Sequence, residues 1–233
     1  MFLAIDKPHG ITSYDVIRKL KKYFPRKTKI WHAWTLDPFA TWLMLIGVWS
    51  WTKRLHKMTW QDKTYITTID FSKYSDTRDL QYWEKFEEHQ VAKDKSYITI
   101  QDKQVPAPTL EKIKKKLNKL VPKSLLPLTP FSAKKIDGKK LYEYAREWNP
   151  IFMNIEMVIH DVKIISYNFP IVELEIAVGK GTYIRSIGYW LGQQFGLAGT
   201  LTSLRRIQSG DIHLNKINNR NEQDGLKVAI IEK

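Results

Sequence analysis

Short apolar runs separated by polar or basic segments make up the first half of the chain. The run 2–6 predicts a strand, and Thr12 can cap a helix over 14–23, in which apolar side chains recur every three or four residues. An alternating pattern predicts another strand over 65–71. Segment 110–120 predicts a helix that carries five lysines.

The second half of the chain mixes predicted strands with predicted helices. Segment 122–130 holds three prolines and therefore predicts a loop. Further strands are predicted over 153–166, 171–178 and 204–212, and further helices over 139–146 and 183–195. Because strands and helices do not alternate regularly, the pattern predicts an α/β or α+β fold around one mixed sheet.

The charge balance narrows the function. The chain has 38 Lys and Arg residues against 24 Asp and Glu residues, a formal net charge of +14. Basic side chains that neutralise phosphates release counterions, so this excess favours a nucleic-acid partner. A membrane surface is a weaker match because the pattern contains no long amphipathic basic helix. A DNA-binding regulator would need a recognition helix that the pattern also lacks.

Composition and the length of the apolar runs bear on the compartment. The chain has no cysteine, which excludes disulfides and thiolate metal sites. Its longest apolar stretch, 43–48, is too short to span a bilayer, and residues 1–6 lead into a predicted strand rather than a signal peptide. We therefore expect a cytoplasmic protein that is not attached to a membrane.

Asp37, in the sequence T-L-D-P at 35–38, is the first candidate for chemistry. An Asp before proline is often only a turn residue that caps the following segment. His32 lies five residues earlier, and basic residues flank the motif in sequence: Lys27, Lys29, Lys53 and Arg54. Nearby positive charge favours an ionised carboxylate, and an ionised carboxylate can act as a nucleophile. Both interpretations are open on these residues alone.

Six motifs follow one another between residue 5 and about residue 212. In chain order they are K-P-H-G-I-T-S at 7–13, W-H-A-W-T-L-D-P-F-A-T-W at 31–42, D-K-T-Y at 62–65, F-S-A-K-K at 131–135 with G-K-K-L-Y at 138–142, G-T-Y-I-R-S at 181–186, and L-R-R at 204–206. This series resembles the TruB family of pseudouridine synthases. The second motif of that family holds a catalytic aspartate, and the fourth belongs to an insertion that grips RNA.

The resemblance implies a fold and a reaction. The fold is the α/β (α+β) fold of pseudouridine synthases, a central mixed, mainly antiparallel β-sheet flanked by helices, with the RNA-gripping insertion at about 105–148. The reaction is the isomerisation of uridine 55 in the T-loop of tRNA to pseudouridine, after the base has been flipped out of its stack. The resemblance also implies that the protein uses no cofactor and no metal, and that it binds the T-arm stem-loop as a monomer.

The same resemblance suggests how the domains are divided. Residues 1–214 are expected to form the catalytic domain, and 215–233 a short C-terminal tail. Many bacterial members of the family carry an additional RNA-binding domain of the PUA type. The 21 residues after Ile212 are too few for one, so we expect the catalytic domain alone.

The motifs assign roles to particular residues. By resemblance, Asp37 is the nucleophile, Arg185 holds its carboxylate through a guanidinium, and Tyr65 stacks on the flipped uracil. We expect stacking rather than proton abstraction because a tyrosine pKa near 10 suits a general base poorly at neutral pH. The residues expected to contact the substrate nucleotide are His32, Tyr65, Tyr183 and Leu204, and those expected to bind RNA are Lys7, Lys135, Lys139 and Arg205.

Without the motifs, these residues have simpler explanations. Arg185 would be a surface charge on a helix, and Tyr65, Tyr183 and Leu204 would be ordinary core residues. The lysines of segment 110–120 fit a solvated helix face as well as they fit phosphate contacts. The alternative function is a non-catalytic tRNA-binding or tRNA-folding protein with the same fold. The joint presence of Asp37, Tyr65 and Arg185 favours the enzyme.

Tryptophan stands at seven positions where the resemblance leads us to expect glycine: Trp31, Trp34, Trp42, Trp49, Trp51, Trp60 and Trp148. Glycine in such motifs serves tight turns and close backbone approach, which a bulky indole opposes. The chain has 11 glycines, roughly 5% against an average of about 7%, and seven more would give roughly 8%. A real aromatic cluster that stacks on RNA is the alternative, but it does not explain why the tryptophans fall on motif glycines.

We interpret these tryptophans as UGA codons that the cell reads as glycine. UGA encodes glycine in one variant genetic code and tryptophan in another, so reading the gene with the second table would produce this substitution and no other. The intact mass of the protein from its native host should then be lower by the difference between seven tryptophans and seven glycines. A mass that requires all nine tryptophans would contradict the hypothesis.

Overall fold

The computed structural model describes residues 1–233 except 34–36, 59, 81–84, 217–220 and 233. The chain forms two compact units. Unit 1 comprises Met1–Ile66 and Leu204–Lys233, and unit 2 comprises Thr67–Ser203. The chain passes between the units along two strands, β4 (Lys63–Asp70) and β15 (Thr200–Ser209). Unit 1 is therefore built from both ends of the sequence, whereas unit 2 is continuous.

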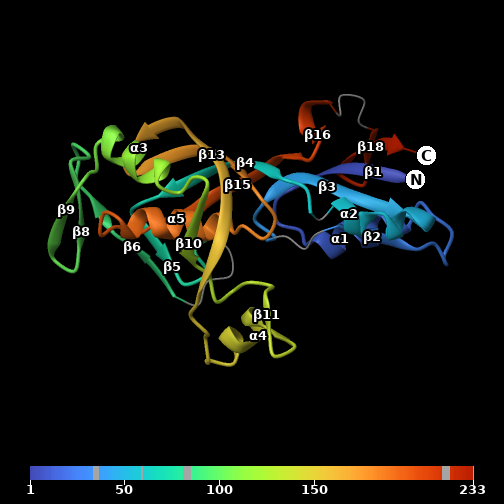
Figure 1. Ribbon diagram of the computed structural model, residues 1–233, viewed down its shortest axis with the longest axis horizontal. Helices are drawn as coiled ribbons and strands as arrows, with labels where there is room; N and C mark the ends of the chain where they lie inside the picture. The colour runs from blue at the N-terminus through green and yellow to red at the C-terminus, as the bar shows by residue number, and fades with distance from the viewer. Residues whose placement is uncertain (34–36, 59, 81–84, 217–220, 233) are drawn as a thin grey trace. The chain divides into compact units, whose positions relative to one another are not determined.

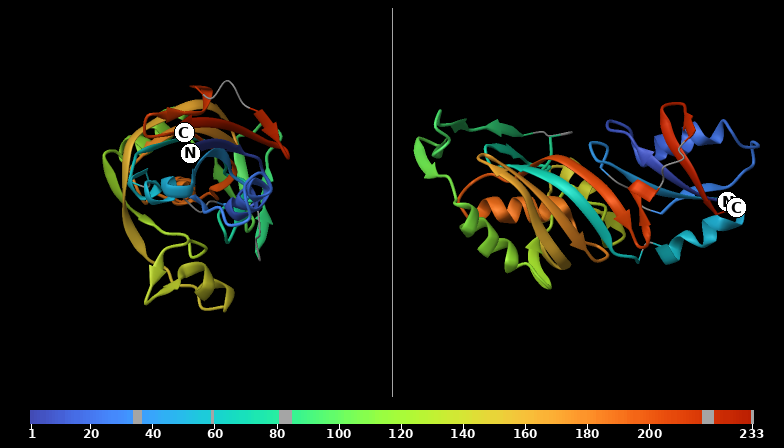
Figure 2. Two further views of the ribbon diagram at one scale, coloured as in Figure 1. Left: turned by 90° about the vertical axis from the view of Figure 1, so that its right-hand side faces the viewer. Right: turned by 90° about the horizontal axis from the view of Figure 1, so that it is seen from above.

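The sheet of unit 1 is arranged around β1 (Phe2–Lys7). β1 pairs antiparallel with β3 (Thr41–Val48) on one side and with β18 (Leu226–Glu232) on the other. β2 (Ile30–His32) pairs with β3, and β17 (Asn221–Gln223) pairs with β18. The two chain ends therefore lie side by side (Figures 1 and 2). The segment that the sequence presents as a tail thus contributes strands to this sheet.

β15 makes the sheet of unit 1 mixed. Its residues Arg205 and Arg206 pair in parallel with Thr41 and Trp42 of β3, whereas β1, β2 and β18 pair antiparallel with their neighbours. A mixed, mainly antiparallel sheet is what the family resemblance implies, and this prediction is confirmed. The short elements of the unit are η1 (Trp49–Lys53), α2 (Leu55–Met58), β16 (Ile212–His213) and η2 (Leu214–Lys216).

The helix α1 (Ser13–Lys21) begins where the sequence predicts it, at Thr12. The Thr12 hydroxyl oxygen accepts a hydrogen bond from the Asp15 backbone N–H at 3.1 Å, and the Asp15 carboxylate accepts one from the Thr12 backbone N–H at 2.7 Å. This reciprocal pair is a capping box, which satisfies two backbone donors that the first helical turn leaves free. The buried face of α1 consists of Val16, Ile17 and Leu20, together with Ser13.

Unit 2 contains a sheet of β10 (Lys123–Pro127), β13 (Asn154–Asn168), β14 (Ile171–Val178) and the end of β4, in that order. β13 and β14 form a long antiparallel pair, which confirms the strands expected from the sequence. The prediction of a loop over 122–130 is wrong for the central part of that segment, because β10 forms there and pairs with β13. β10 is an edge strand with prolines just before it and at its end, where a missing N–H is tolerated.

The polar segment 72–108 folds into short strands that the sequence pattern does not reveal. β5 and β6 form one small sheet and β7, β8 and β9 another. Their bounds are Lys73–Ser75, Phe86–Glu88, Gln90–Val91, Tyr97–Ile100 and Lys103–Pro106. Strands of two to four residues are too short to show an alternating pattern in the sequence.

Two helices, α3 (Leu110–Asn118) and α5 (Ile184–Gln193), pack on one another, and they also contact β13 and β10 respectively. α5 approaches the loop before β15 so closely that only glycine fits. A Cβ at Gly192 would lie 1.8 Å from the carbonyl oxygen of Ala198. Backbone contact at this position therefore requires the glycine.

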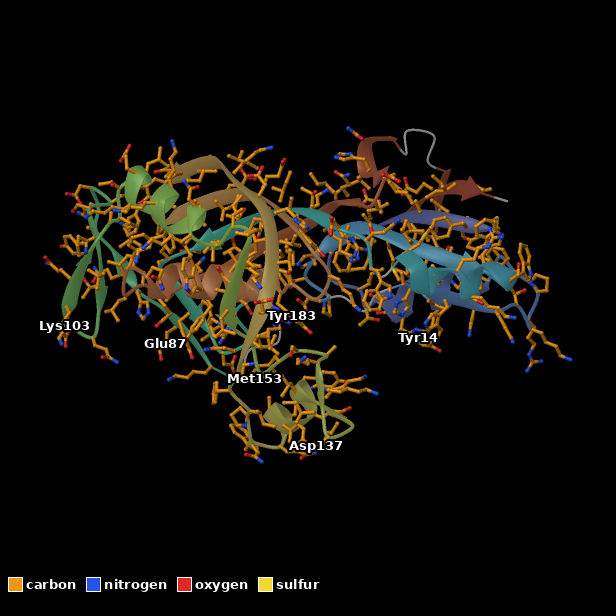
Figure 3. The ribbon with its side chains drawn as sticks, in the orientation of Figure 1. Tyr14, Glu87, Lys103, Asp137, Met153 and Tyr183 are labelled. Atoms are coloured by element: carbon orange, nitrogen blue, oxygen red, sulfur yellow. The ribbon has the colours of Figure 1, made fainter. Side chains whose placement is uncertain are left out.

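A small projecting segment lies between β10 and β13. β11 (Lys135–Ile136) and β12 (Lys139–Lys140) form a hairpin, and α4 (Leu141–Arg146) follows it. Asp137 and Gly138 at its turn have φ of +50° and +80°, as the Asp-Gly pair of a type I′ turn requires. Figure 3 shows Asp137 at the outer part of this segment. α3 and β10, which the expected insertion also includes, pack on the body of unit 2 instead.

Among the described residues, two of these tryptophans adopt a backbone conformation that favours glycine. Trp49 has φ +56° and Trp148 has φ +59°, in the left-handed region that costs a residue with a Cβ about 1–2 kcal/mol. Trp148 follows the C-cap of α4, and its N–H donates to the Ala145 carbonyl at 3.2 Å. The next N–H, of Asn149, donates to the Tyr144 carbonyl at 3.1 Å. These two bonds form a Schellman motif, and Trp148 holds the position that glycine usually occupies.

Trp42 fits its position poorly for another reason. Its side chain is fully buried, and among the described residues its indole N–H has no acceptor. A buried, unpaired donor costs about 1–3 kcal/mol. Together with Trp49 and Trp148, this residue supports the interpretation that the natural chain has glycine here, which stays a hypothesis. Trp34 lies outside the described residues.

The substitution Trp148→Gly should stabilise the protein by about 1 kcal/mol, because it relieves the left-handed backbone while the exposed indole loses little burial. The matched control is Trp190→Gly in the middle of α5, which should destabilise by about 1 kcal/mol or more. Urea unfolding of the two variants and the parent protein measures both effects. Equal destabilisation by the two substitutions would contradict the assignment of Trp148 to a glycine position.

Candidate active site

Lys7 ties the end of β1 to the loop that carries Asp37. Its side chain is fully buried. The Nζ atom donates to the carbonyl oxygens of Pro8, Ile11 and Pro38 at 3.0, 2.7 and 3.1 Å. An ammonium group has three N–H donors, so these three carbonyls can satisfy it. The backbone beside Asp37 is thereby fixed to the turn that follows β1.

A second hydrogen bond reinforces this connection. The Gly10 N–H donates to the same Pro38 carbonyl at 3.0 Å, and Gly10 has φ +84°, which a residue with a side chain rarely adopts. Burial lowers the pKa of Lys7 from 10.5 to about 8, and the nearby Asp37 carboxylate opposes this shift. Lys7, expected from the sequence to bind RNA, thus supports the site from inside the protein, because its ammonium group is closed off from solvent.

Tyr65 on β4 and Arg206 on β15 form the second part of the site. Arg206 is fully buried, donates Nε and Nη2 to the Leu43 carbonyl at 3.0 and 2.6 Å, and lies over the Trp42 ring at 4.3 Å. Burial raises the pKa of Tyr65, and the nearby Asp37 carboxylate raises it further. The charge and hydrogen bond of Arg206 lower this pKa and oppose both effects. The Tyr65 phenol therefore stays protonated at neutral pH, which fits a stacking role better than a role as a base.

These interactions bring Asp37, Lys7, Tyr65 and Arg206 together within unit 1. Asp37 itself is half-buried and directly precedes the segment that enters β3. The sequence identifies three members of this cluster, but the role of Arg206 is missed. The signal was available in the L-R-R motif, since adjacent residues of a strand point to opposite faces and one arginine must turn inward.

Two residues expected at the substrate nucleotide also belong to unit 1. His32 lies on β2, where its ring stacks on Trp31 with 5.5 Å between the ring centroids. Leu204 is nearly buried on β15, two residues before Arg206. Their contacts with a nucleotide stay predictions.

Arg185, in the first turn of α5, is held within unit 2. Its guanidinium donates to the Thr77 carbonyl at 2.7 Å and to the Phe131 carbonyl at 3.0 Å, and forms a buried ion pair with Asp79 at 3.1 Å. Arg185 and Asp37 belong to different units, so the pairing expected between them stays a prediction. The contacts in unit 2 exclude the simpler explanation, a solvated surface charge on a helix.

Asp79 is a second residue whose importance the sequence does not show. The segment around it suggests only a turn, yet Asp79 and its neighbour Arg78 are both buried. Arg78 lies over the Tyr189 ring at 3.8 Å, and burial lowers its pKa to about 10. Tyr183, expected at the substrate, caps α5 beside Arg185. A long-range ion pair of this kind leaves no local pattern in the sequence.

The other residues expected to bind RNA are in contrasting surroundings. Arg205 forms a two-pronged ion pair with Asp6, at 3.1 and 2.9 Å. Lys139 pairs with Glu147 in the projecting segment, and Lys135 is exposed on β11. Their RNA contacts stay predictions, and Lys135 has the most accessible charge of the three.

Over the part of the chain that the structure describes, no three His, Asp or Glu side chains gather in a way that could hold a metal ion. No helix in the same part is both long and apolar enough to cross a membrane.

The stability that Lys7 contributes should depend on pH. In the folded protein its pKa is about 8, against an ordinary value of 10.5, so between these values the unfolded chain binds one more proton than the folded one. The unfolding free energy of the parent protein, relative to Lys7→Met, should therefore rise as pH increases from 8 to 10.5 and be flat below 8. Urea unfolding at several pH values measures it, with exposed Lys227→Met as the control. Parallel curves for the parent and Lys7→Met would contradict the prediction.

Solved structures share this fold at low sequence identity. A Cbf5-Nop10-Gar1 complex contains a chain that matches with a TM-score of 0.64 at 17% identity, over 92% of this chain and 51% of that one. An H/ACA RNP bound to a substrate RNA containing 2'-deoxyuridine matches with a TM-score of 0.62 at 17% identity, over 92% and 50%. The chain thus spans about half the length of these solved chains, and the likeness concerns the fold alone.

Sequence comparisons identify the family. The family model described as TruB family pseudouridylate synthase (N terminal domain) matches residues 21–184. A tRNA pseudouridine synthase B of Chlamydia muridarum is 35% identical over 95% of this chain and 86% of its own length. The enzyme of the same name from Caldicellulosiruptor saccharolyticus is 34% identical over 89% of this chain and 67% of its own length. That of Protochlamydia amoebophila is 38% identical over 89% of this chain and 73% of its own length. The chain therefore belongs to the TruB family of pseudouridylate synthases.

Proposed function

We propose that this protein is a tRNA pseudouridine synthase, an isomerase that converts uridine 55 in the T-loop of tRNA to pseudouridine. The observation that supports it most strongly is the family match over residues 21–184, which includes Asp37 and Tyr65. Relatives that carry the name tRNA pseudouridine synthase B cover most of the chain. The net charge of +14 suits an RNA substrate.

The proposed chemistry assigns the reacting carboxylate to Asp37. The bond from uracil N1 to the ribose breaks, the base turns, and a bond forms from its carbon 5 to the same ribose carbon. The hydrogen on carbon 5 leaves as a proton while N1 gains one, so the reaction is an isomerisation without net oxidation. A target base inside a folded loop has to be flipped out first. Tyr65 is proposed to stack on it, since its phenol stays protonated.

The finer features of this function are also proposals. We assign the T-arm stem-loop as the bound element, with His32, Tyr183 and Leu204 at the target nucleotide. Arg185 is assigned to hold the Asp37 carboxylate, as a guanidinium does in bidentate pairs. Lys135, Lys139 and Arg205 are assigned to the RNA backbone. We further assign a catalytic domain over 1–214, whose sheet the following segment extends with β17 and β18. A monomeric state and a cytoplasmic location are also assigned, which suit an enzyme whose relatives are bacterial tRNA-modifying proteins.

The substitution Asp37→Asn tests the assignment directly. Tritium release from carbon-5-labelled uridine in a T-arm stem-loop should fall by about a thousandfold or more, because the amide cannot replace the carboxylate as nucleophile. RNA binding, measured by filter retention, should be unchanged. Asp211→Asn, the same change at an exposed position of unit 1, is the matched control and should keep full activity.

The experiment is performed on two forms of the chain. One has tryptophan at the seven positions interpreted as glycine, and the other has glycine at those positions. Activity confined to the glycine form would support both the enzyme and the codon hypothesis. Binding of RNA without tritium release by either form would instead favour the non-catalytic tRNA-binding protein.

A further inference from the structure

The positive charge of this protein is concentrated in one part of unit 1. Between Arg18 and Arg54 the chain has nine Lys and Arg residues and a single carboxylate, Asp37. This segment therefore supplies more than half of the net charge of +14. Such segregation is the electrostatic pattern of a surface that meets a polyanion.

A groove of about 500 Å³ lies within this basic segment. Its lining residues are Lys21, Thr28, Lys29, Ile30, Trp31 and Thr52. Trp31 is one of the positions interpreted above as glycine in the natural chain, so the proposal rests on the two lysines and Thr28 and not on the indole. They come from the end of α1, from the loop before β2, from β2 itself and from η1. α1 and β2 lie beside one another in Figure 1 and are in contact. The groove combines two ammonium groups with the Thr28 hydroxyl, groups from which phosphate oxygens can accept hydrogen bonds, whereas the Thr52 hydroxyl already donates to the Trp49 carbonyl at 2.9 Å.

The two lysines of the groove differ from the neighbouring cations in their surroundings. In the described part of the chain, neither Lys21 nor Lys29 forms an ion pair, and both are exposed. The neighbouring cations differ, since Arg18 pairs with Asp15 and Lys22 pairs with Asp224. Lys21 and Lys29 therefore keep the charge that ion pairs offset at Arg18 and Lys22.

The end of the groove at Lys29 and Ile30 is distant from Asp37, whereas Trp31 in its lining stacks on His32, which is assigned to the target nucleotide. β2 pairs with the far end of β3, where Ile30 faces Val48 and Trp31 faces Gly47. Asp37 precedes the opposite end of β3, at Thr41. A strand advances about 3.3 Å per residue, so the two ends are on the order of 20 Å apart. A nucleotide held at Asp37 cannot also fill this groove.

We propose that this groove binds the sugar–phosphate backbone of the substrate RNA, at a part of the molecule outside the loop that contains the target uridine. The inference rests on the proposed function for the identity of the RNA. An anionic membrane surface is a poorer partner, because the lysines line a concave groove rather than the flat face of an amphipathic helix. Contacts of this kind position an RNA without reading its sequence.

The double substitution Lys21→Gln/Lys29→Gln tests the proposal in the full chain. Binding of whole tRNA is measured at several salt concentrations. Losing two phosphate contacts should reduce the slope of log affinity against log salt by about 1.5, and should weaken binding roughly tenfold near 0.15 M salt. The matched control, Lys93→Gln/Lys103→Gln, removes the same charge from two exposed lysines beside β8 and β9, and should change the slope much less.

A second measurement uses an isolated T-arm stem-loop at saturating concentration. Both double variants should release tritium from it at the parental rate, because the end of the groove at Lys29 is distant from Asp37. An unchanged slope with whole tRNA, or an equal change in the control pair, would overturn the proposal. So would loss of binding to anionic lipid vesicles with tRNA binding intact. If the parent protein releases no tritium, the proposed function fails, while the slope still decides whether the groove binds RNA.

Discussion

A buried ammonium group holds together the part of unit 1 on which the candidate site depends. An isolated buried charge costs far more free energy than the margin that stabilises a domain. Lys7 avoids most of this cost because three backbone carbonyls accept its hydrogen bonds. The ammonium group therefore binds the turn after β1 and the Pro38 carbonyl at the same atom, which fixes the two segments relative to one another. Asp37, one residue earlier, is therefore placed by covalent geometry.

The same arrangement recurs at the two buried arginines. Arg206 donates twice to the Leu43 carbonyl, and Arg185 donates to the carbonyls of Thr77 and Phe131. Backbone carbonyls are fixed in space, so a cation bound to them has little freedom to reorient. A second group, a phenol for Arg206 and a carboxylate for Arg185, then meets a guanidinium that is already oriented. Such preorganisation is what an active site needs if charged groups are to act without rearrangement.

Local patterns predict local structure well in this chain and long-range structure poorly. The capping residue of α1 and the β13–β14 pair follow from residues close together in the sequence. β10 is hidden by its prolines, because an edge strand tolerates them where an inner strand does not. At the site, ordered motifs identify the family and its aspartate, Asp37. The partner of Arg185 in unit 2, Asp79, is more than a hundred residues away in sequence, and no periodicity links the two.

The course of the chain through the two units has a consequence for how the protein folds during synthesis. Unit 2 is one continuous stretch, so all of its strands and helices have been made once Ser203 leaves the ribosome. Unit 1 is interrupted by it, and β1 remains an open edge until β18 pairs with it. An unpaired edge strand is a template for association with other chains. β1 is therefore translated long before the strand that covers its edge, and the nascent chain is most exposed to aggregation in that interval.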